Sequence, residues 1–202
     1  MPPRSASPQV TLVCCSLLDG ALAVLVTDRG AALPTRALGA RETPDAAAEG
    51  LRRSLLGRVS TWQGQVAAMR AESALVIAYA ALVPVGTAAP TGHRWLPVGR
   101  GGAAPLIRAA VAHLRDRLDR EPIAFHLLGP QFTLSDLQQV YELLLERRLH
   151  KASFRRTLLS AHLVEPTEAW RSEGRGRPAQ LFRFSPRRRR GVQRAVRFEL
   201  LG

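Results

Sequence analysis

Basic residues concentrate in the last third of this chain, at spacings that suit a nucleic acid. The first four candidate DNA-binding residues fall in a predicted helix at 150–164, and the last two flank a glycine in a predicted turn. They are Lys151, Ser153, Arg155, Arg156, Arg175 and Arg177. Guanidinium groups donate paired hydrogen bonds to phosphate oxygens and to guanine. The pattern therefore favours contact with double-stranded DNA, with the helix in the major groove.

Two helices and a hairpin are expected to position these residues. Apolar side chains recur at helical spacing within 132–149, which predicts a first helix. Those positions are Leu134, Leu137, Val140, Tyr141, Leu144 and Leu145. In the second helix we expect Phe154, Leu158 and Leu159 to face inward, and Lys151, Arg155 and Arg156 to face outward. A glycine-rich turn and a short strand follow at 174–184. This order is typical of a winged helix-turn-helix.

The charge distribution agrees with a nucleic-acid partner. The net charge is +13, and the residues from Pro122 onward carry 15 basic and 7 acidic side chains, against 14 and 9 in the longer part before them. Positive charge is therefore denser where phosphates would be neutralised. An arginine-rich composition, with a single lysine, makes any one arginine weak support. The run Arg187–Arg190 fits either a phosphate-contacting segment or a solvated patch.

The first half of the chain has the pattern of an α/β domain. Residues 9–29 predict two strands joined at Asp19-Gly20, a dipeptide favoured in hairpin turns. Further along, we expect a helix with Thr43 or Asp45 as its N-cap, a buried strand, a short strand and a bridging helix. Their ranges are Asp45–Leu56, Ser73–Val83, His93–Val98 and Leu106–Leu118.

Cysteine and apolar content limit the remaining classes of function. Cys14 and Cys15 are adjacent in a strand, so they point to opposite faces and are expected to be buried free thiols rather than a disulfide. The histidines show no metal-ligand spacing, and His126 is expected to be a core residue. We expect no metal site, no cofactor and no catalytic residues. No apolar run is long enough to span a membrane and no signal peptide is evident, which predicts a cytoplasmic protein without a membrane partner.

At the C-terminal end, the motifs resemble the winged-helix domain of the Nudix-related transcriptional regulators of the NrtR type. The resemblance covers about 55 residues, in order and with the family's spacing. Its matching segments are Phe132-Thr133-Leu134, Leu137–Glu142, Phe154-Arg155-Arg156, Gly174–Ala179 and Leu181–Phe184.

The N-terminal part looks like the Nudix domain of the same family, but it departs from the catalytic motif. Leu33-Pro34, Glu42, Ala47-Ala48 and Gly57 stand at box-like spacing, whereas the segment Gly50–Gly57 contains no carboxylate. A working Nudix box needs several carboxylates on one helix to hold Mg²⁺, and the metal generates the nucleophile. The resemblance therefore implies a catalytically dead domain.

The same resemblance implies a nucleotide sensor. The family uses its degenerate Nudix domain to bind ADP-ribose or a related nucleotide and to dimerise. Candidate ligand-binding residues are Arg36, Arg52, Arg53 and Arg70, whose guanidinium groups match a diphosphate. A solvated basic face is the alternative for each of them, and an altered ligand or none is also open. The family's pocket motifs are missing around Met69–Ser73 and Ala104–Leu106.

Taken together, the sequence predicts an α+β protein with a Nudix-like α/β/α sandwich followed by a winged helix-turn-helix. We expect a sensor and dimerisation domain at 9–120, including a linker helix at 104–120, and a DNA-binding domain at 122–202. The predicted function is a homodimeric, sequence-specific transcriptional regulator, by family analogy a repressor in NAD metabolism, that binds a pseudo-palindromic operator. Two alternatives remain: a divergent Nudix hydrolase of nucleoside diphosphate derivatives, and a non-enzymatic protein-interaction module.

Overall fold

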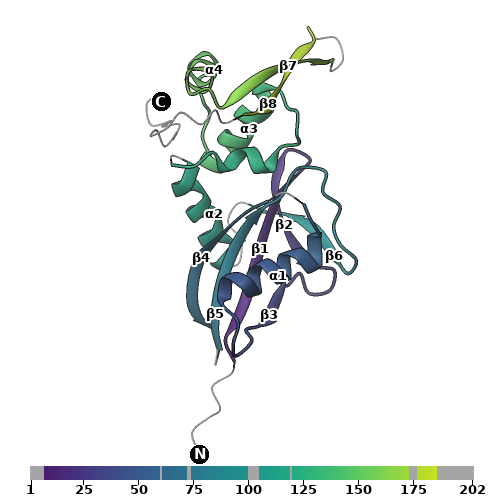
Figure 1. The fold of residues 1–202 in the computed structure, drawn as a ribbon, viewed down its shortest axis with the longest axis vertical. Coiled ribbons are helices and arrows are strands. Elements are labelled where there is room, and N and C mark those ends of the chain that lie inside the picture. Colours follow the sequence, from purple (N-terminus) through teal and green to yellow (C-terminus); the bar gives the residue numbers. More distant parts are fainter. Residues whose placement is uncertain are drawn as a thin grey trace, which may run out of the picture. The chain divides into compact units, whose positions relative to one another are not determined.

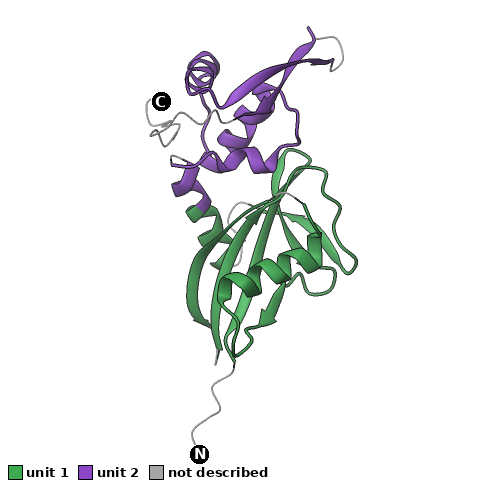
Figure 2. Ribbon diagram, in the orientation of Figure 1, with its two compact units in different colours: residues 1–113 green, residues 114–202 purple. Residues whose placement is uncertain are grey.

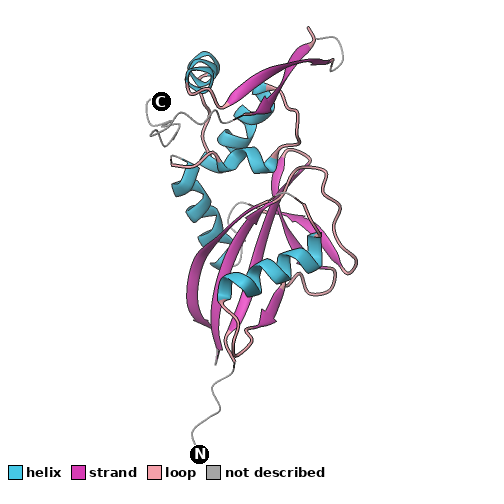
Figure 3. Cartoon of the chain, in the orientation of Figure 1, coloured by secondary structure: helices cyan, strands magenta, loops and turns pink. Residues whose placement is uncertain are grey.

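The computed structural model describes residues 7–59, 61–71, 74–99, 105–118, 120–172 and 177–185. The chain divides into two structural units, residues 1–113 and 114–202 (Figure 2). Both units contain helices and strands (Figure 3). The boundary falls within helix α2, Pro105–Leu118. No helix within the described ranges combines the length and the apolar character needed to cross a membrane.

Strand β1, Gln9–Leu18, is the central strand of the first unit (Figure 1). It pairs in parallel with β5, Ala74–Leu82, and antiparallel with β2, Ala21–Thr27. The short β3, Thr35–Ala37, pairs with the beginning of β1. Residues 10–16 are all buried. This explains why the strand reads as a continuous apolar run instead of an alternating one.

The predicted hairpin between β1 and β2 is confirmed. Asp19 and Gly20 both have positive φ angles, 49° and 75°, which a type I′ turn requires. Strands β4, Trp62–Ala71, and β6, His93–Pro97, complete a sheet with the order β4-β5-β1-β2-β6. The sequence predicted β5 and β6 to within about two residues, but neither β3 nor β4.

Helix α1, Pro44–Leu56, lies across one face of this sheet (Figure 1). Thr43 is its N-cap and accepts a hydrogen bond from the backbone N–H of Ala46 at 3.2 Å. The helix ends at Gly57, which has a φ of 63°. Ala47, Ala48 and Leu56 are buried in the same cluster as several strand residues, so the helix packs through small side chains. The strand residues are Val10, Leu12, Cys14, Leu25, Tyr79, Ala81 and Val83.

Both cysteines are buried free thiols, as expected. Cys14 belongs to the cluster under α1, and Cys15, the next residue of the strand, points to the opposite face. Burial raises the pKa of Cys15 to about 12 and raises that of Cys14 even further. Both thiols therefore remain protonated and unreactive at neutral pH.

After the end of α2, the described residues of the second unit form a 3₁₀ helix, two α-helices and a hairpin. Its elements are the 3₁₀ helix η1, Ile123–Leu127, the helices α3, Leu134–Leu145, and α4, Lys151–Ser160, and the strands β7, Val164–Arg171, and β8, Ala179–Phe184. An isolated bridge joins Phe132 to Phe182. The ring of Phe125 stacks on that of Phe184, with centroids 4.3 Å apart, and tilts against that of Phe132 at 5.6 Å. These aromatic contacts join η1 to the hairpin.

The C-terminal turn of α2 contacts the end of α3. Arg115 donates a hydrogen bond from Nε to the carbonyl oxygen of Leu144 at 2.9 Å and forms an ion pair with Glu146 at 3.0 Å. Carbonyl groups in the last turn of a helix have no partner within the helix, so a guanidinium group stabilises this end.

Candidate nucleic-acid interface

Helix α3 is anchored at its N-terminus by a reciprocal cap. The Thr133 hydroxyl accepts from the N–H of Asp136 at 3.0 Å, and the Asp136 carboxylate accepts from the N–H of Thr133 at 2.8 Å. This capping box satisfies two backbone donors that the helix itself leaves unpaired. Most predicted inward residues are buried, namely Leu134, Leu137, Val140, Tyr141 and Leu144, whereas Leu145 is half-buried. The helix is therefore fixed in rotation against the core of the second unit.

The turn between α3 and α4 is held by one carboxylate. Glu142 accepts hydrogen bonds from the N–H of Leu149 at 2.8 Å, from Gln138 Nε2 at 2.9 Å and from Arg148 at 3.1 Å. Gln138 also donates to the carbonyl oxygen of Leu149 at 3.0 Å. Glu146 ends α3 in the left-handed conformation, with a φ of 54°. These contacts determine how α4 leaves the turn.

Glu142 is ionised in this position. Its side chain is only 11% exposed, and this burial by itself raises the carboxyl pKa. The hydrogen bonds from Leu149, Gln138 and Arg148 more than offset the burial and bring the pKa below its ordinary value. The folded state thus stabilises the carboxylate relative to the unfolded chain.

His150 is the N-cap of helix α4, and its ring Nδ1 accepts a hydrogen bond from the N–H of Ser153 at 3.4 Å. Phe154 and Leu158 are fully buried, and the Phe154 ring meets Tyr141 edge-on with centroids 5.6 Å apart. The interpretation of Phe154 as a core residue is confirmed. The expectation that Leu159 faces inward is wrong, because its side chain is 46% exposed. A helix that buries positions four apart directs the position next to them toward solvent.

The candidate DNA-binding residues of α4 differ in exposure. Lys151 and Arg156 are exposed, whereas Ser153 and Arg155 are half-buried. The Nε atom of Arg155 is buried and has no hydrogen-bond partner in the described part of the chain. The outward orientation expected for all three basic side chains therefore holds for Lys151 and Arg156, and only partly for Arg155.

Strands β7 and β8 form the wing, an antiparallel hairpin with a bulge between Pro166 and Trp170. Arg171, at the end of β7, forms an ion pair with Asp136 at 2.7 Å. Asp136 is the acidic residue of the α3 capping box, so one carboxylate joins the wing to the helix. This link was not predicted, because 35 residues separate its partners.

The tip of the wing lies partly outside the described residues. Arg177 is exposed beside the start of β8, whereas Arg175 and the run Arg187–Arg190 lie outside the described part. Trp170 is exposed to 58% on the outer side of β7, and it pairs with Gln180 across the hairpin. The exposed residues Lys151 and Arg156 thus belong to a helix that is directly followed by a wing with an exposed arginine and an exposed indole.

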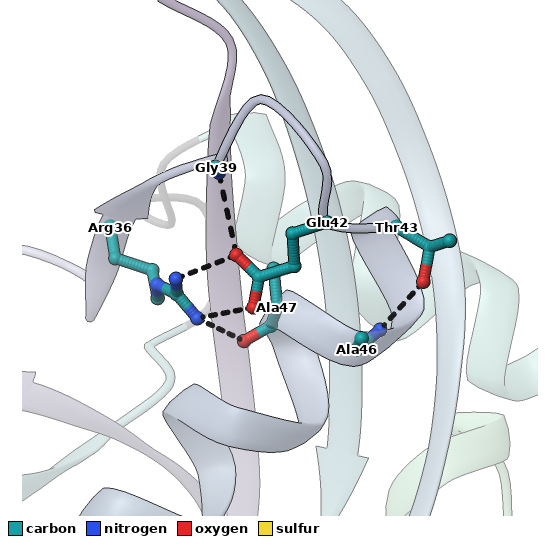
Figure 4. A network of polar contacts seen from close by, with 6 residues as sticks. All are labelled: Arg36, Gly39, Glu42, Thr43, Ala46 and Ala47. Atoms are coloured by element: carbon teal, nitrogen blue, oxygen red, sulfur yellow. Dashed lines mark hydrogen bonds and ion pairs between the residues drawn. The ribbon is translucent and has the colours of Figure 1, made fainter.

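In the first unit, Arg36 is held by the segment that precedes α1. Its guanidinium group donates to both oxygens of Glu42, at 3.0 and 2.7 Å, and to the carbonyl oxygen of Ala47 at 3.4 Å (Figure 4). Glu42 also accepts from the N–H of Gly39 at 3.3 Å. This carboxylate, which stands at the beginning of the box-like segment, is thereby engaged by an arginine.

Arg52 and Arg53 share a second carboxylate on α1. Buried Arg52 donates from Nε and Nη2 to the two oxygens of Glu49 at 2.9 and 2.7 Å, and from Nη1 to the carbonyl oxygen of Val59 at 3.3 Å. Arg53 donates to Glu49 at 2.6 Å. The hydrogen bond from Arg52 is the main reason why the pKa of Glu49 lies below its ordinary value. Arg70 is exposed on β4.

The remaining acid near the box-like segment also has a partner. Asp45 accepts a hydrogen bond from the Tyr79 hydroxyl at 3.0 Å. Burial, together with this contact, raises the pKa of Tyr79 to about 12, so the phenol remains a donor. Within the described residues, no group of three or more histidine, cysteine, aspartate or glutamate side chains is placed to hold a metal ion.

Comparison with known proteins shows two relationships. Residues 124–184 match the family model of the NrtR DNA-binding winged helix domain. A stretch of 80 residues is 38% identical to the ADPR responsive transcriptional repressor NtrR of Acinetobacter baylyi, and it makes up 40% of this chain and 32% of that repressor. The chain thus spans about a third of the length of the curated relative it matches.

Two solved structures resemble the fold over most of its length. NrtR of Shewanella oneidensis, solved in complex with a 27mer DNA, is 24% identical with a TM-score of 0.74, covering 89% of this chain and 94% of that one. A MutT/nudix family protein from Enterococcus faecalis is 14% identical with a TM-score of 0.64, covering 92% and 89%. At these identities the likeness concerns the fold.

These findings define a class: an α+β protein with a Nudix-like fold followed by a winged helix-turn-helix. The fold class expected from the sequence is confirmed. The second unit contains a winged helix domain of the NrtR type, and the resemblance to the Nudix-related transcriptional regulators is likewise confirmed.

Glu142→Gln is expected to lower the free energy of unfolding by about 1–3 kcal/mol at neutral pH, because a buried acceptor loses its charge. The folded-state pKa of Glu142 lies below the unfolded value, so its stabilisation is complete above the ordinary glutamate pKa of about 4.3 and is lost as the pH falls through the folded pKa. Urea unfolding at about pH 7 and about pH 3 measures this change. The difference between wild type and variant should shrink at the lower pH.

The matched control is Glu168→Gln, which changes an exposed glutamate on β7. It should leave stability within about 0.5 kcal/mol at both pH values. An equal loss of stability in both variants would contradict the structural role of Glu142.

Proposed function

We propose that this protein is a sequence-specific transcriptional repressor whose Nudix-like domain senses ADP-ribose or a related nucleotide without hydrolysing it. One observation carries the proposal: the exposed basic residues of α4 lie within the segment that matches the NrtR DNA-binding winged helix model. Helix α4 carries Lys151, Arg155 and Arg156 and no acidic residue. A helix of this charge is attracted to the phosphates that border the major groove.

The proposed DNA-binding residues are Lys151, Ser153, Arg155 and Arg156 of the helix, with Arg175 and Arg177 of the wing. The exposed positions of Lys151, Arg156 and Arg177 support this set. The half-buried Ser153 and Arg155 contribute from the sides of the helix. Phosphate contacts position the protein on the duplex, whereas contacts with base edges provide sequence specificity.

The first unit is proposed to be the sensor and the dimerisation domain. The named relative is an ADPR responsive repressor, which supports ADP-ribose as the effector. A nucleotide diphosphate has to compete with the carboxylates of Glu42 and Glu49 for Arg36, Arg52 and Arg53, while Arg70 is exposed. Two copies related by a two-fold axis would present two α4 helices to a pseudo-palindromic operator.

Loss of hydrolysis follows from the residues of the box-like segment. No carboxylate stands between Gly50 and Gly57, and Glu42 and Glu49 are each bound by arginine. A Mg²⁺ ion needs several free carboxylate or carbonyl oxygens. We infer that the helix has kept its packing role and has lost its catalytic one.

The direct test is selection of duplexes from a random pool with the full-length protein, followed by fluorescence anisotropy at about 150 mM salt. We expect one enriched sequence, bound at least about a thousandfold more tightly than a scrambled duplex. ADP-ribose should weaken this binding. Arg156→Ala should remove most of the discrimination between the two duplexes, because a base contact is lost. Equal binding to both duplexes by the wild type would contradict a sequence-specific regulator.

The contact between Arg171 and Asp136 is proposed to hold the wing in its DNA-binding position. Arg171→Met should weaken DNA binding several-fold while changing the free energy of unfolding by about 1 kcal/mol or less, since the ion pair is partly exposed. Anisotropy and urea unfolding measure the two quantities. The control is Arg183→Met, which removes the same charge from an ion pair with Glu165 inside the hairpin. Equal effects of both variants on affinity would show that only charge matters.

ADP-ribose incubated with the protein and Mg²⁺ should remain intact, because the box-like segment cannot hold the metal. Chromatography of the nucleotide after prolonged incubation measures turnover, and an active Nudix hydrolase serves as the positive control. Metal-dependent release of AMP above the rate in buffer would favour the alternative of a divergent hydrolase.

A further inference from the structure

Helix α4 exposes Lys151, Ala152, Arg156, Leu159 and Ser160, and three of these residues form what we call the stripe. Ala152, Arg156 and Leu159 are all exposed, and their spacings of four and three residues place them along one side of the helix. The buried Phe154 and Leu158 lie on the opposite side. Packing against Tyr141 therefore determines which side chains remain available to a partner.

The two arginines of α4 are thereby distinguished. Arg156 stands in the middle of the stripe, between the two apolar side chains. Arg155 lies at the flank of the helix and is half-buried, with its Nε atom in the protein interior. The exposed Arg156 side chain can extend away from the protein, whereas the partial burial of Arg155 restricts the reach of its side chain.

Along the helix axis, the stripe presents an apolar side chain, then a cationic one, then a second apolar one. Leu159 is 46% exposed and is the one large apolar side chain among the exposed residues of α4. In the major groove, guanine offers two acceptors to an arginine, and thymine offers a C5-methyl group to an apolar side chain. Seven residue steps separate Ala152 from Leu159, which is about 10 Å at 1.5 Å per residue and close to the rise of three base pairs.

We propose that Arg156 contacts a guanine while Leu159 and Ala152 pack on the methyl groups of neighbouring thymines, and that Arg155 contacts phosphate. This inference rests on the proposed function and assigns the specificity of the same site. The occupant is double-stranded DNA, because α4 carries three basic residues and no carboxylate. The operator half-site should therefore contain a guanine with thymines within about two base pairs.

The experiment uses the full-length protein and the duplex that it selects from a random pool. Single thymines are replaced by uracil, which lacks only the C5-methyl group, and single guanines by 7-deazaguanine, which lacks the N7 acceptor. For the wild type, we expect that uracil at one position weakens binding about 3- to 10-fold and that 7-deazaguanine at one position weakens it about 5- to 100-fold. We call these two losses of affinity the uracil penalty and the 7-deazaguanine penalty.

Three variants then assign each penalty to a side chain. In Leu159→Ala the uracil penalty should disappear, and in Arg156→Ala the 7-deazaguanine penalty should disappear. Arg155→Ala should weaken binding to every duplex equally and keep both penalties. Leu75→Ala, which truncates an exposed leucine of β5, should change nothing. Because all of these side chains except Arg155 are well exposed, thermal unfolding should show folded variants.

Persistence of the uracil penalty in Leu159→Ala, or loss of the 7-deazaguanine penalty in Arg155→Ala but not in Arg156→Ala, would overturn the assignment and leave the regulator intact. A wild-type protein that selects no sequence would overturn both this assignment and the proposed function. If all three variants kept the wild-type preference for the selected duplex, the assignment would be overturned, and the stripe would instead be a candidate surface for a protein partner.

Discussion

The burial of Phe154 and Leu158 is the constraint on which the proposed DNA-binding surface depends. These side chains are fully buried, and Phe154 packs edge-on against Tyr141 of α3. Because an α-helix repeats every 3.6 residues, fixing two positions on one side fixes every other position of α4. The exposure of Arg156 and the partial burial of Arg155 both follow from this contact. The turn that Glu142 holds and the wing that Arg171 joins to α3 then set the surroundings of the helix.

The contacts of helix α1 agree with the proposal that the first unit does not hydrolyse nucleotides. Small buried residues, Ala47 and Ala48, still pack α1 onto the sheet, and Gly57 still ends the helix. The box-like segment from Gly50 to Gly57 carries arginines and no carboxylate, and the buried Arg52 is paired with Glu49. Because the Arg52 side chain is 8% exposed and that of Glu49 is 36% exposed, loss of the glutamate would leave a buried charge without its ion-pair partner. Glu49 and Arg52 therefore hold each other in place on α1.

Much of the fold could be predicted from the sequence because local patterns determine it. Asp19-Gly20 marks a type I′ hairpin, and Thr43, one of the two N-cap candidates, marks the start of α1 to within one residue, because each has a specific backbone role. Strand β4 was not predicted from the sequence. It pairs only with β5 in the described sheet, and as an edge strand with mixed composition it lacks the continuous apolar pattern of β1 and β5.

The candidate site was less predictable, because its contacts join distant parts of the chain. Helical periodicity placed Phe154 correctly, but it could not show that the short α4 has room to bury only two of its three large apolar residues, which leaves Leu159 exposed. Two ion pairs depend on loop and hairpin geometry that no local sequence pattern encodes. They join Arg36 to Glu42 and Arg171 to Asp136. The type and region of the basic residues were therefore predictable, and their individual partners were not.

Hydroxyl-radical footprinting of the full-length protein, with and without its selected duplex, tests the central claim most directly. Leu159 and Trp170 are exposed on α4 and on the wing, whereas Leu75 and Val85 are exposed in the first unit. If α4 and the wing bind DNA, oxidation of Leu159 and Trp170 falls on complex formation, and oxidation of Leu75 and Val85 is unchanged. Unchanged oxidation of Leu159 in a complex that binds specifically would contradict the account, because DNA would then contact another surface.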